Sequence, residues 1–345
     1  MSTDLSKLPV HVLADKLKSR SVSPVDLVAT CLDRIAKLDP KLHAFVEVYE
    51  SEARLAAEAA DKAIRSGHAI GPLHGIPIAL KDLIELEGRV ASGGSAAWRD
   101  RRVEDAAVLL QVMQGADPRD PRTQALRDAD PLPTLRRGVR GLRLARIAPG
   151  ERDGVATDVL AAYDRSVSQL EEMGAEIVDL RLPRRFRDYH ESTMGRIGSA
   201  EAYALLSDIV DDDEQPIDDA VRPRVRAGAA ISSRDYLGAL AERERLKLEF
   251  AASFAHVDAL LAPVTMTPAI PLAAVDQRAM PTLFTRWANF LDLCGLAVPN
   301  GFTASGLPLS LQIVCRGGDE AMALRVGWAW QNATEWHERV PPLAQ

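Results

Sequence analysis

The chain has 345 residues, of which 47% are hydrophobic and 26% charged, a balance typical of globular proteins that excludes a disordered or collagen-like chain. Its 42 lysines and arginines stand against 49 aspartates and glutamates, for a net charge of -7, so no basic excess is available to bind a nucleic-acid backbone. The three cysteines, Cys31, Cys294 and Cys315, favour a reducing compartment over a disulfide framework. Without a signal-peptide pattern or an apolar run of about 18 residues, the sequence predicts a cytoplasmic protein with no nucleic-acid or membrane partner.

The N-terminal part of the sequence is predicted to be helical. Ser23 has the character of an N-cap, Pro24 follows at the first helical position, and apolar residues then recur at helical spacing. We expect Asp39–Pro40 to stop this helix, because proline cannot continue the backbone hydrogen bonds. A second, alanine-rich helix is predicted over 51–66.

Strands and helices alternate farther along the chain. The short apolar run Ile76–Leu80 follows a cluster of glycine and proline and is interpreted as a buried strand. Strands predicted at 142–147 and 176–180 enclose a helix at 156–173, which indicates a βαβ unit. Further predictions are strands at 259–262 and 310–314 and a closing helix at 319–334. This order predicts an α/β fold.

Common catalytic and nucleotide-binding motifs are missing from the sequence. It contains no G-x-G-x-x-G or phosphate-binding G-x-x-x-x-G-K-[ST], and no H-E-x-x-H or C-x-x-C that would indicate a metal. The closest approach to the nucleophile elbow G-x-S-x-G is Gly93–Ala97, which lacks the final glycine. The sequence therefore predicts neither a metal site nor a nucleotide cofactor.

Lys81 is the first candidate for chemistry, because it directly follows the predicted strand Ile76–Leu80. Burial at the end of a strand lowers the pKa of a lysine, and a neutral lysine can take the proton of a serine hydroxyl, as in Ser-Lys hydrolases. Alternatively, Lys81 pairs with Asp82 or extends its ammonium to solvent. Spacing alone leaves both interpretations open.

Several segments, in their order along the chain, resemble enzymes of the amidase signature family. The run Gly71–Leu83 is similar to the segment that carries that family's catalytic lysine. The others are 88–100, 260–265, 295–302, 306–312 and 334–337. The resemblance implies an α/β fold with a mixed sheet flanked by helices, and amide hydrolysis or transfer without a metal or organic cofactor. It also implies a serine nucleophile, a second serine in a cis peptide and a lysine, of which Lys81 alone carries over.

The two serine motifs of that family do not occur here. Ser95 follows Gly-Gly, as the family's nucleophile does, but Ala96 and Ala97 come next and no arginine follows. It lies 14 residues after Lys81, where the family has a different serine ahead of its next strand. Ser95 is therefore only a weak candidate for a substitute nucleophile, and a turn serine is the alternative. Up to about Asp100 the chain resembles the family's first arm, and from Arg102 it resembles the part after the signature region. A block on the order of a hundred residues, the size of a small domain, is expected to be missing between them.

The sequence thus predicts one amidase-like domain over 1–345, with an N-terminal arm 1–100, a C-terminal part 101–345, a seam near 100–102 and an incomplete central sheet. We interpret it as a scaffold for hydrolysing the C–N bond of a small-molecule carboxylic amide, impaired or inactive because both serines are absent: a pseudoenzyme with an incomplete Ser-Ser-Lys triad. A non-catalytic binding protein is one alternative. Another is a decayed product that exposes apolar strand edges near 76–80.

Two further points stay open from the sequence alone. It does not distinguish a free-standing amidase from the glutamine-hydrolysing subunit of a transfer-RNA amidotransferase. The region 187–240, with Tyr189, Tyr203 and Tyr236, supplies either the loops that contact substrate or aromatic side chains of a helical core.

Overall fold

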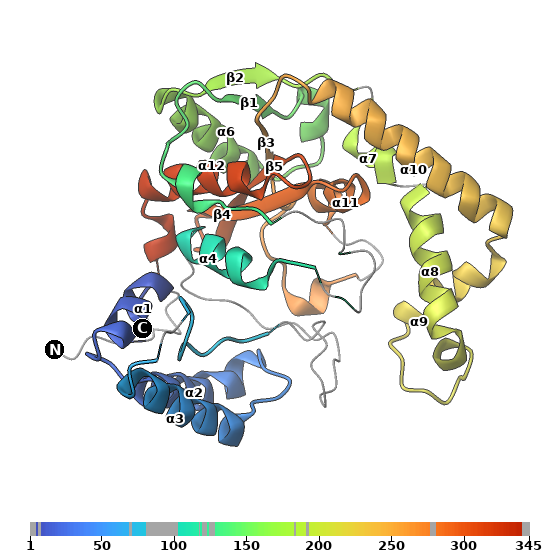
Figure 1. Cartoon of the computed structure of the whole chain (residues 1–345). Helices are drawn as coiled ribbons and strands as arrows, with labels where there is room; N and C mark the ends of the chain where they lie inside the picture. Colours follow the sequence, from blue (N-terminus) through green and yellow to red (C-terminus); the bar gives the residue numbers. More distant parts are fainter. Residues whose placement is uncertain are drawn as a thin grey trace. The chain divides into compact units, whose positions relative to one another are not determined.

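The computed structural model describes residues 5, 8–68, 71–80, 103–116, 118, 123, 128–182, 184–190, 193–276 and 281–339. The chain divides into two compact units (Figure 1). The helical unit comprises Met1–Met113 with His337–Gln345, and the sheet unit comprises Gln114–Trp336. No helix in the described ranges has the length and hydropathy required to cross a bilayer.

The described residues of the helical unit form four α-helices: α1 Val10–Lys18, α2 Pro24–Leu42, α3 Glu50–Arg65 and α4 Val103–Met113. The predicted start of α2 is confirmed, because the Ser23 hydroxyl accepts the N–H of Asp26 at 3.0 Å. The predicted stop is two residues early. Pro40 lies inside the last turn, and the Asp39 carboxylate accepts the N–H groups of Ala44 and Phe45 beyond it. The helix therefore ends at a side-chain cap and not at the proline itself.

Apolar side chains on three helices form the core of this unit. Leu13 and Leu17 of α1 meet Leu27 of α2 and Ile64 of α3, each at most 7% exposed. A neighbouring cluster joins Val28 and Leu32 of α2 to Ala57 of α3. The helices thus bury one face each, as their apolar spacing predicts.

The segment 71–80 corrects one prediction, because Ile76–Leu80 forms no strand. Ile76 packs against the core cluster of the helices, whereas Ile78 is 54% exposed. Gly75 has φ +79°, and a Cβ there would lie 2.7 Å from Cγ of Pro24, so only glycine lets the chain pass so close to α2. The apolar composition of Ile76–Leu80 favours a strand, but Ile76 instead packs against the helices. Pro77 also has no N–H to donate to a neighbouring strand.

In the part of the sheet unit that the structure describes, five strands form one sheet in the order β2-β1-β3-β5-β4. They are β1 Arg143–Arg146, β2 Glu176–Asp179, β3 Ala259–Pro263, β4 Cys294–Phe302 and β5 Pro308–Cys315. β1 pairs in parallel with both β2 and β3, while β5 pairs antiparallel with β3 and β4. The predicted βαβ unit is confirmed as β1, α6 and β2, and the α/β class with a mixed sheet flanked by helices is confirmed with it.

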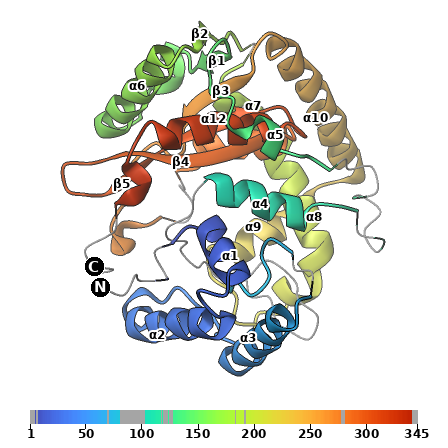
Figure 2. The same ribbon diagram turned by 60° about the vertical axis from the view of Figure 1, so that its left-hand side comes forward.

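Helices surround this sheet (Figure 2). The α-helices are α5 Leu132–Leu135, α6 Thr157–Glu172, α7 Phe186–His190, α8 Thr193–Val210, α9 Val221–Arg226, α10 Ser233–Ser253, α11 Leu283–Phe290 and α12 Glu320–Asn332. Short 3-10 helices occur at Pro149–Arg152, Ala227–Ala230, Leu272–Ala274 and Trp336–Glu338. α6 packs against β3, β4 and β5, and α12 packs against β4 and β5, so the sheet is covered by helices far from each other in sequence.

The hydroxyl of Tyr163, on α6, links two neighbouring strands at the centre of this sheet. Tyr163 is 1% exposed, accepts the N–H of Ile147 at 2.9 Å and donates to the carbonyl of Leu261 at 3.1 Å. Ile147 directly follows β1 and Leu261 lies in β3. The tyrosine therefore satisfies two backbone groups at the junction of two parallel strands, and its burial raises its pKa.

Aromatic side chains form a second part of the core, between α7, α10 and α11. Phe186 stacks on Trp287 with ring centroids 4.6 Å apart, and Phe250 contacts Trp287, Tyr189 and Phe254. All five side chains are at most 1% exposed. This cluster fixes α7 in place, and with it the segment that enters α7 from β2.

Candidate functional site

The residues that the sequence singled out for catalysis lie outside the described part of the chain. Lys81, Ser95 and the seam at 100–102 all fall in the range 81–102. Their roles therefore stay predictions. The described residues 71–80 lead directly to Lys81, and they are held by Gly75 against α2 and by His74, whose Nε2 lies 3.2 Å from the carbonyl oxygen of Ala60.

Several serines that follow Lys81 have structural hydrogen bonds. Ser166 is fully buried, donates to the carbonyl of Ala162 and accepts from the Asn300 amide. Ser232 caps α10 by accepting the N–H of Asp235. Each of these hydroxyls forms a hydrogen bond with a group of its own helix, so neither is positioned as a nucleophile that a base could activate.

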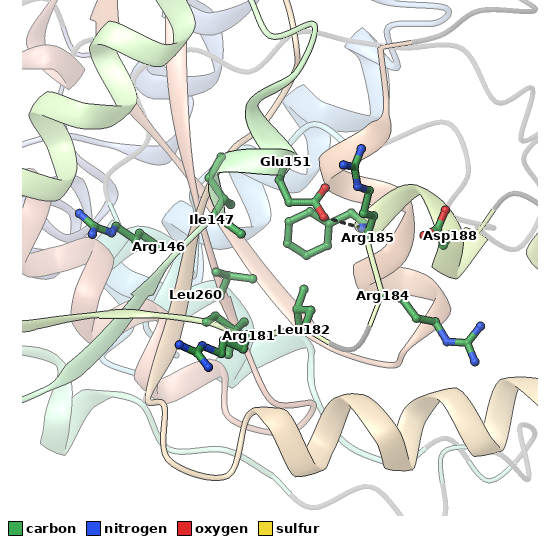
Figure 3. Close-up of a pocket in the computed structure, with 13 residues that line it drawn as sticks. Arg146, Ile147, Glu151, Arg181, Leu182, Arg184, Arg185, Asp188 and Leu260 are labelled. Carbon is green, nitrogen blue, oxygen red and sulfur yellow. Dashed lines mark hydrogen bonds between the residues drawn. The ribbon is translucent and has the colours of Figure 1, made fainter.

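A cavity of about 530 Å³ lies where the parallel strands end (Figure 3). The segments after β1 and β2 and one residue of β3 form its walls, because the carboxyl ends of parallel strands meet at one edge of the sheet. Its apolar lining is Ile147, Leu180, Leu182, Phe186 and Leu260. The remaining lining residues are Arg146, Ala148, Gly150, Glu151, Arg181, Arg184, Arg185 and Asp188.

Glu151 is an acidic group in the cavity that contacts the start of α7. It belongs to the 3-10 helix Pro149–Arg152, and its carboxylate accepts the N–H of Phe186 at 3.2 Å (Figure 3). Burial raises the pKa of this carboxyl above its ordinary value of 4.5, and the nearby charge of Asp188 adds to the rise. The bond from Phe186 and the charge of Arg185 act in the opposite direction. The result is a carboxyl that holds its proton to higher pH than an exposed glutamate.

Arginine side chains surround the mouth of the cavity and form ion pairs there. Arg146 pairs with Asp179 at 2.6 Å, and Arg184 pairs with Glu249 at 3.0 Å. In Figure 3 both guanidinium groups point away from the apolar floor, on opposite sides. These two arginines therefore lie at the rim of the cavity. Its interior is lined by the apolar side chains and the Glu151 carboxyl.

The aromatic residues of 187–240 lie in helices. Tyr189 of α7 is fully buried in the aromatic cluster. Tyr203 of α8 donates to Asp211 at 2.7 Å, and Tyr236 of α10 donates to Glu201 at 2.9 Å. The helical-core interpretation is therefore correct for Tyr189, and the other two hydroxyls join surface hydrogen bonds between and within helices.

Sequence reasoning missed the cavity although the sequence contains a signal for it. The predicted βαβ unit places the residues after 147 and after 180 at one edge of a sheet, which is where ligands bind in α/β folds. Glu151 lies four residues beyond Ile147. In the described ranges, no three side chains among His, Cys, Asp and Glu are grouped to hold a metal.

Comparisons with known proteins place this geometry in a family. An amidase family model matches residues 26–102 and 100–324. An amidase of Pseudomonas putida is 27% identical over 472 aligned positions that cover 99% of each chain. A glutamyl-tRNA(Gln) amidotransferase subunit of Geobacter metallireducens is 25% identical, with 97% of this chain and 99% of that protein covered.

Solved structures agree with the fold. A bacterial aryl acylamidase of the amidase signature family has a TM-score of 0.79 and 18% identity, with 96% of this chain and 97% of the other covered. A peptide amidase in complex with chymostatin has a TM-score of 0.82 and 18% identity, covering 97% and 99%. The family match spans most of the sequence, including both the segment that leads to Lys81 and the strands around the cavity, and the chain therefore belongs to the amidase signature family.

Proposed function

We propose that this chain keeps the amidase scaffold and its catalytic lysine, Lys81, but lacks the serine nucleophile and the cis-serine, so that it hydrolyses carboxylic amides poorly or not at all. The observation that carries the proposal is the division of the family match. One piece ends at 102 and the next begins at 100, which is the position of the seam inferred from the sequence.

The length of the alignments supports a missing block. The Pseudomonas putida amidase aligns over 472 positions, whereas this chain has only 345 residues. Positions of the relative without a counterpart here must lie inside the alignment, because it covers 99% of both chains. On this proposal they belong to the seam at 100–102, with the two catalytic serines among them.

The chemistry explains why such a loss would impair hydrolysis. A serine nucleophile divides amide cleavage into acylation and deacylation, and without it no acyl-enzyme forms. Each lost donor to the developing oxyanion costs about 100-fold or more in rate. Lys81 as a base for water would retain proton transfer, which contributes far less than the complete arrangement.

The test combines a serine-directed fluorophosphonate probe with an assay of amide hydrolysis. The native chain is compared with Lys81→Ala and Ser95→Ala after each has been shown to unfold cooperatively. Acetanilide and glutamine are both assayed, because relatives include amidases and amidotransferase subunits. We expect no labelled serine, and amide turnover by the native chain equal to that of Lys81→Ala.

Two other outcomes would overturn the proposal. Labelling of a single serine that disappears in Lys81→Ala would identify a substitute nucleophile, and its loss in Ser95→Ala would assign that role to Ser95. A native chain without a cooperative unfolding transition would favour the decayed product. Peptide mass mapping locates any label in the first case.

Ligand binding without hydrolysis is a second candidate function, favoured by the cavity of about 530 Å³ with its aliphatic floor and the Glu151 carboxyl. Calorimetry with acetanilide tests it, because the aryl group suits the floor and the amide can hydrogen-bond to Glu151. We expect Glu151→Ala to weaken binding roughly three- to tenfold, the net value of one hydrogen bond. Glu172→Ala, at the far end of α6, is the control and should bind as the native chain does.

A further inference from the structure

Cys294 and Cys315 face each other across two neighbouring strands. Cys294 is the first residue of β4 and Cys315 the last of β5, and the antiparallel register pairs them directly. Directly opposed residues of such a pair point to the same face of the sheet, with Cβ atoms about 4.5–5.5 Å apart. A disulfide needs Cα atoms about 4.4–6.8 Å apart, which this pairing provides. None of the three cysteines is in a disulfide.

The two thiols have different surroundings. Cys315 is fully buried, whereas Cys294 is half-buried and its Sγ donates to the carbonyl of Arg316 at 3.3 Å. A hydrogen bond from Cys315 lowers the pKa of Cys294, and the same bond together with burial raises the pKa of Cys315. An oxidant from solvent therefore meets Cys294 first, and at that position a thiolate is stabilised by its neighbour.

We propose that Cys294 and Cys315 are a redox modification site, in which hydrogen peroxide converts the two thiols into a reversible disulfide across β4 and β5. In the first step the Cys294 thiolate attacks one peroxide oxygen, the O–O bond breaks, and a sulfenic acid forms while the second oxygen leaves as water after taking a proton. In the second step the Cys315 sulfur attacks the sulfenic sulfur, the S–O bond breaks, and the departing hydroxide takes the Cys315 proton. The two thiols lose two electrons, and the peroxide is reduced to two waters.

The first step also prepares the second. Two of the main causes that raise the pKa of Cys315 come from Cys294: the hydrogen bond that Cys315 donates and the charge of the thiolate. The charge of the thiolate ends when Cys294 becomes a neutral sulfenic acid, so the buried thiol is then easier to deprotonate. The order of reaction, Cys294 before Cys315, follows from the greater exposure of Cys294.

The position of the pair indicates what the bond would do. β4 is an edge strand of the sheet, and the pair lies at the end of the β4–β5 hairpin opposite its turn. Next to it, the guanidinium of Arg316 donates to the carbonyls of Phe254 and Val257, which follow α10. A disulfide here would clamp the open end of the hairpin beside the end of α10, so oxidation should raise the Tm.

The experiment exposes the folded chain to hydrogen peroxide and measures the intact mass, and a second portion is blocked with iodoacetamide in denaturant before the unreduced peptides are measured. We expect two of the three thiols to disappear, the mass to fall by two hydrogen atoms, and one peptide to join Cys294 to Cys315, with dithiothreitol reversing the change. Cys31→Ser is the matched control, and it should form the same bond. Cys294→Ser should form none.

Other outcomes would overturn the proposal. One is that Cys294 gains oxygen but forms no disulfide, so that the Cys315 thiol still reacts with iodoacetamide once the chain is unfolded. Another is that, in the folded chain, Cys294 forms disulfides with Cys31 as often as with Cys315. A peroxide reaction in concentrated urea supplies the reference for random pairing, and a selectivity no greater in the folded chain than in urea would also contradict the site. This comparison uses the native chain, so its result does not depend on whether a cysteine variant folds.

Discussion

The Tyr163 hydroxyl holds two parallel strands together at one point. It accepts the N–H after β1 and donates to a carbonyl of β3, in a fully buried position. Tyr163→Phe removes the hydroxyl and leaves both backbone groups unsatisfied, so we expect the free energy of unfolding to fall by about 1–3 kcal/mol. Urea denaturation measures the change. Tyr203→Phe, whose hydroxyl bonds to the exposed Asp211, is the control, and an equal loss in both variants would contradict this account.

Glu151 gives the stability of the chain a defined dependence on pH. Burial raises its pKa in the folded state above the ordinary value of 4.5, so the folded chain binds this proton more tightly than the unfolded chain. The contribution to stability is complete at pH below 4.5 and is lost as pH rises through the folded pKa. We therefore expect Glu151→Gln to gain stability relative to the native chain as the pH rises above 4.5 and through the raised pKa of Glu151. Unfolding free energies at several pH values test this, and a difference that does not vary with pH would contradict it.

Among the helices and strands, the sequence correctly predicted those that carry a local signal, such as an N-cap or regularly spaced apolar residues. The Ser23–Pro24 start of α2, the unit of β1, α6 and β2, and the helix α12 are all confirmed. The sequence indicates β4 only through a family segment, because Gly295, Pro299 and Gly301 argue against a strand. The structure accommodates them at the sheet edge, with a bulge between Pro299 and Gly301. The prediction for Ile76–Leu80 is wrong for the opposite reason: its composition suits a strand, but tertiary contacts decide its conformation.

The cap of α2 allows a test at this scale. Ser23→Ala removes the oxygen that accepts the N–H of Asp26, and we expect a loss of about 1 kcal/mol in the free energy of unfolding. Ser23→Thr keeps a hydroxyl in the same place and should restore most of that stability. Thermal unfolding followed by circular dichroism measures both. Equal effects of alanine and threonine would show that the hydroxyl does not act as a cap.

At the scale of the molecule, the site depends on parts of the sequence that no local pattern connects. The cavity needs the segments after 147 and 180 and a residue of β3, which is more than a hundred positions from β1 along the chain. Only the assembled sheet brings them together. Lys81 could be named as a candidate because a family segment surrounds it, while the expected loss of both serines could be inferred only against a known pattern. Ser95 and the seam stay predictions for the same reason, since neither follows from the described residues.

The two compact units raise a question about cooperativity. We propose that the single amidase-like domain predicted over 1–345 unfolds as one, although the chain divides at Met113 and Gln114. Ser23→Ala in the helical unit and Tyr163→Phe in the sheet unit should then lower the midpoint of the same urea transition. Circular dichroism reports both units, and fluorescence reports mainly the sheet unit, which holds four of the five tryptophans: Trp287, Trp328, Trp330 and Trp336. Two separate transitions, each shifted by one variant, would contradict a single domain.

The order of the strands also has a consequence for how the sheet assembles. β1 and β2 are joined through α6, and β4 and β5 through a short turn, so both pairs can form from nearby segments. β3 lies between these pairs, parallel to β1 and antiparallel to β5. The contact at its edge between Arg143 and Asp258 closes a loop of 115 residues, and such closures are slow compared with local pairing. In refolding, β3 is therefore the strand whose arrival converts two independent local structures into one sheet, and the cavity at its end forms only with that last step.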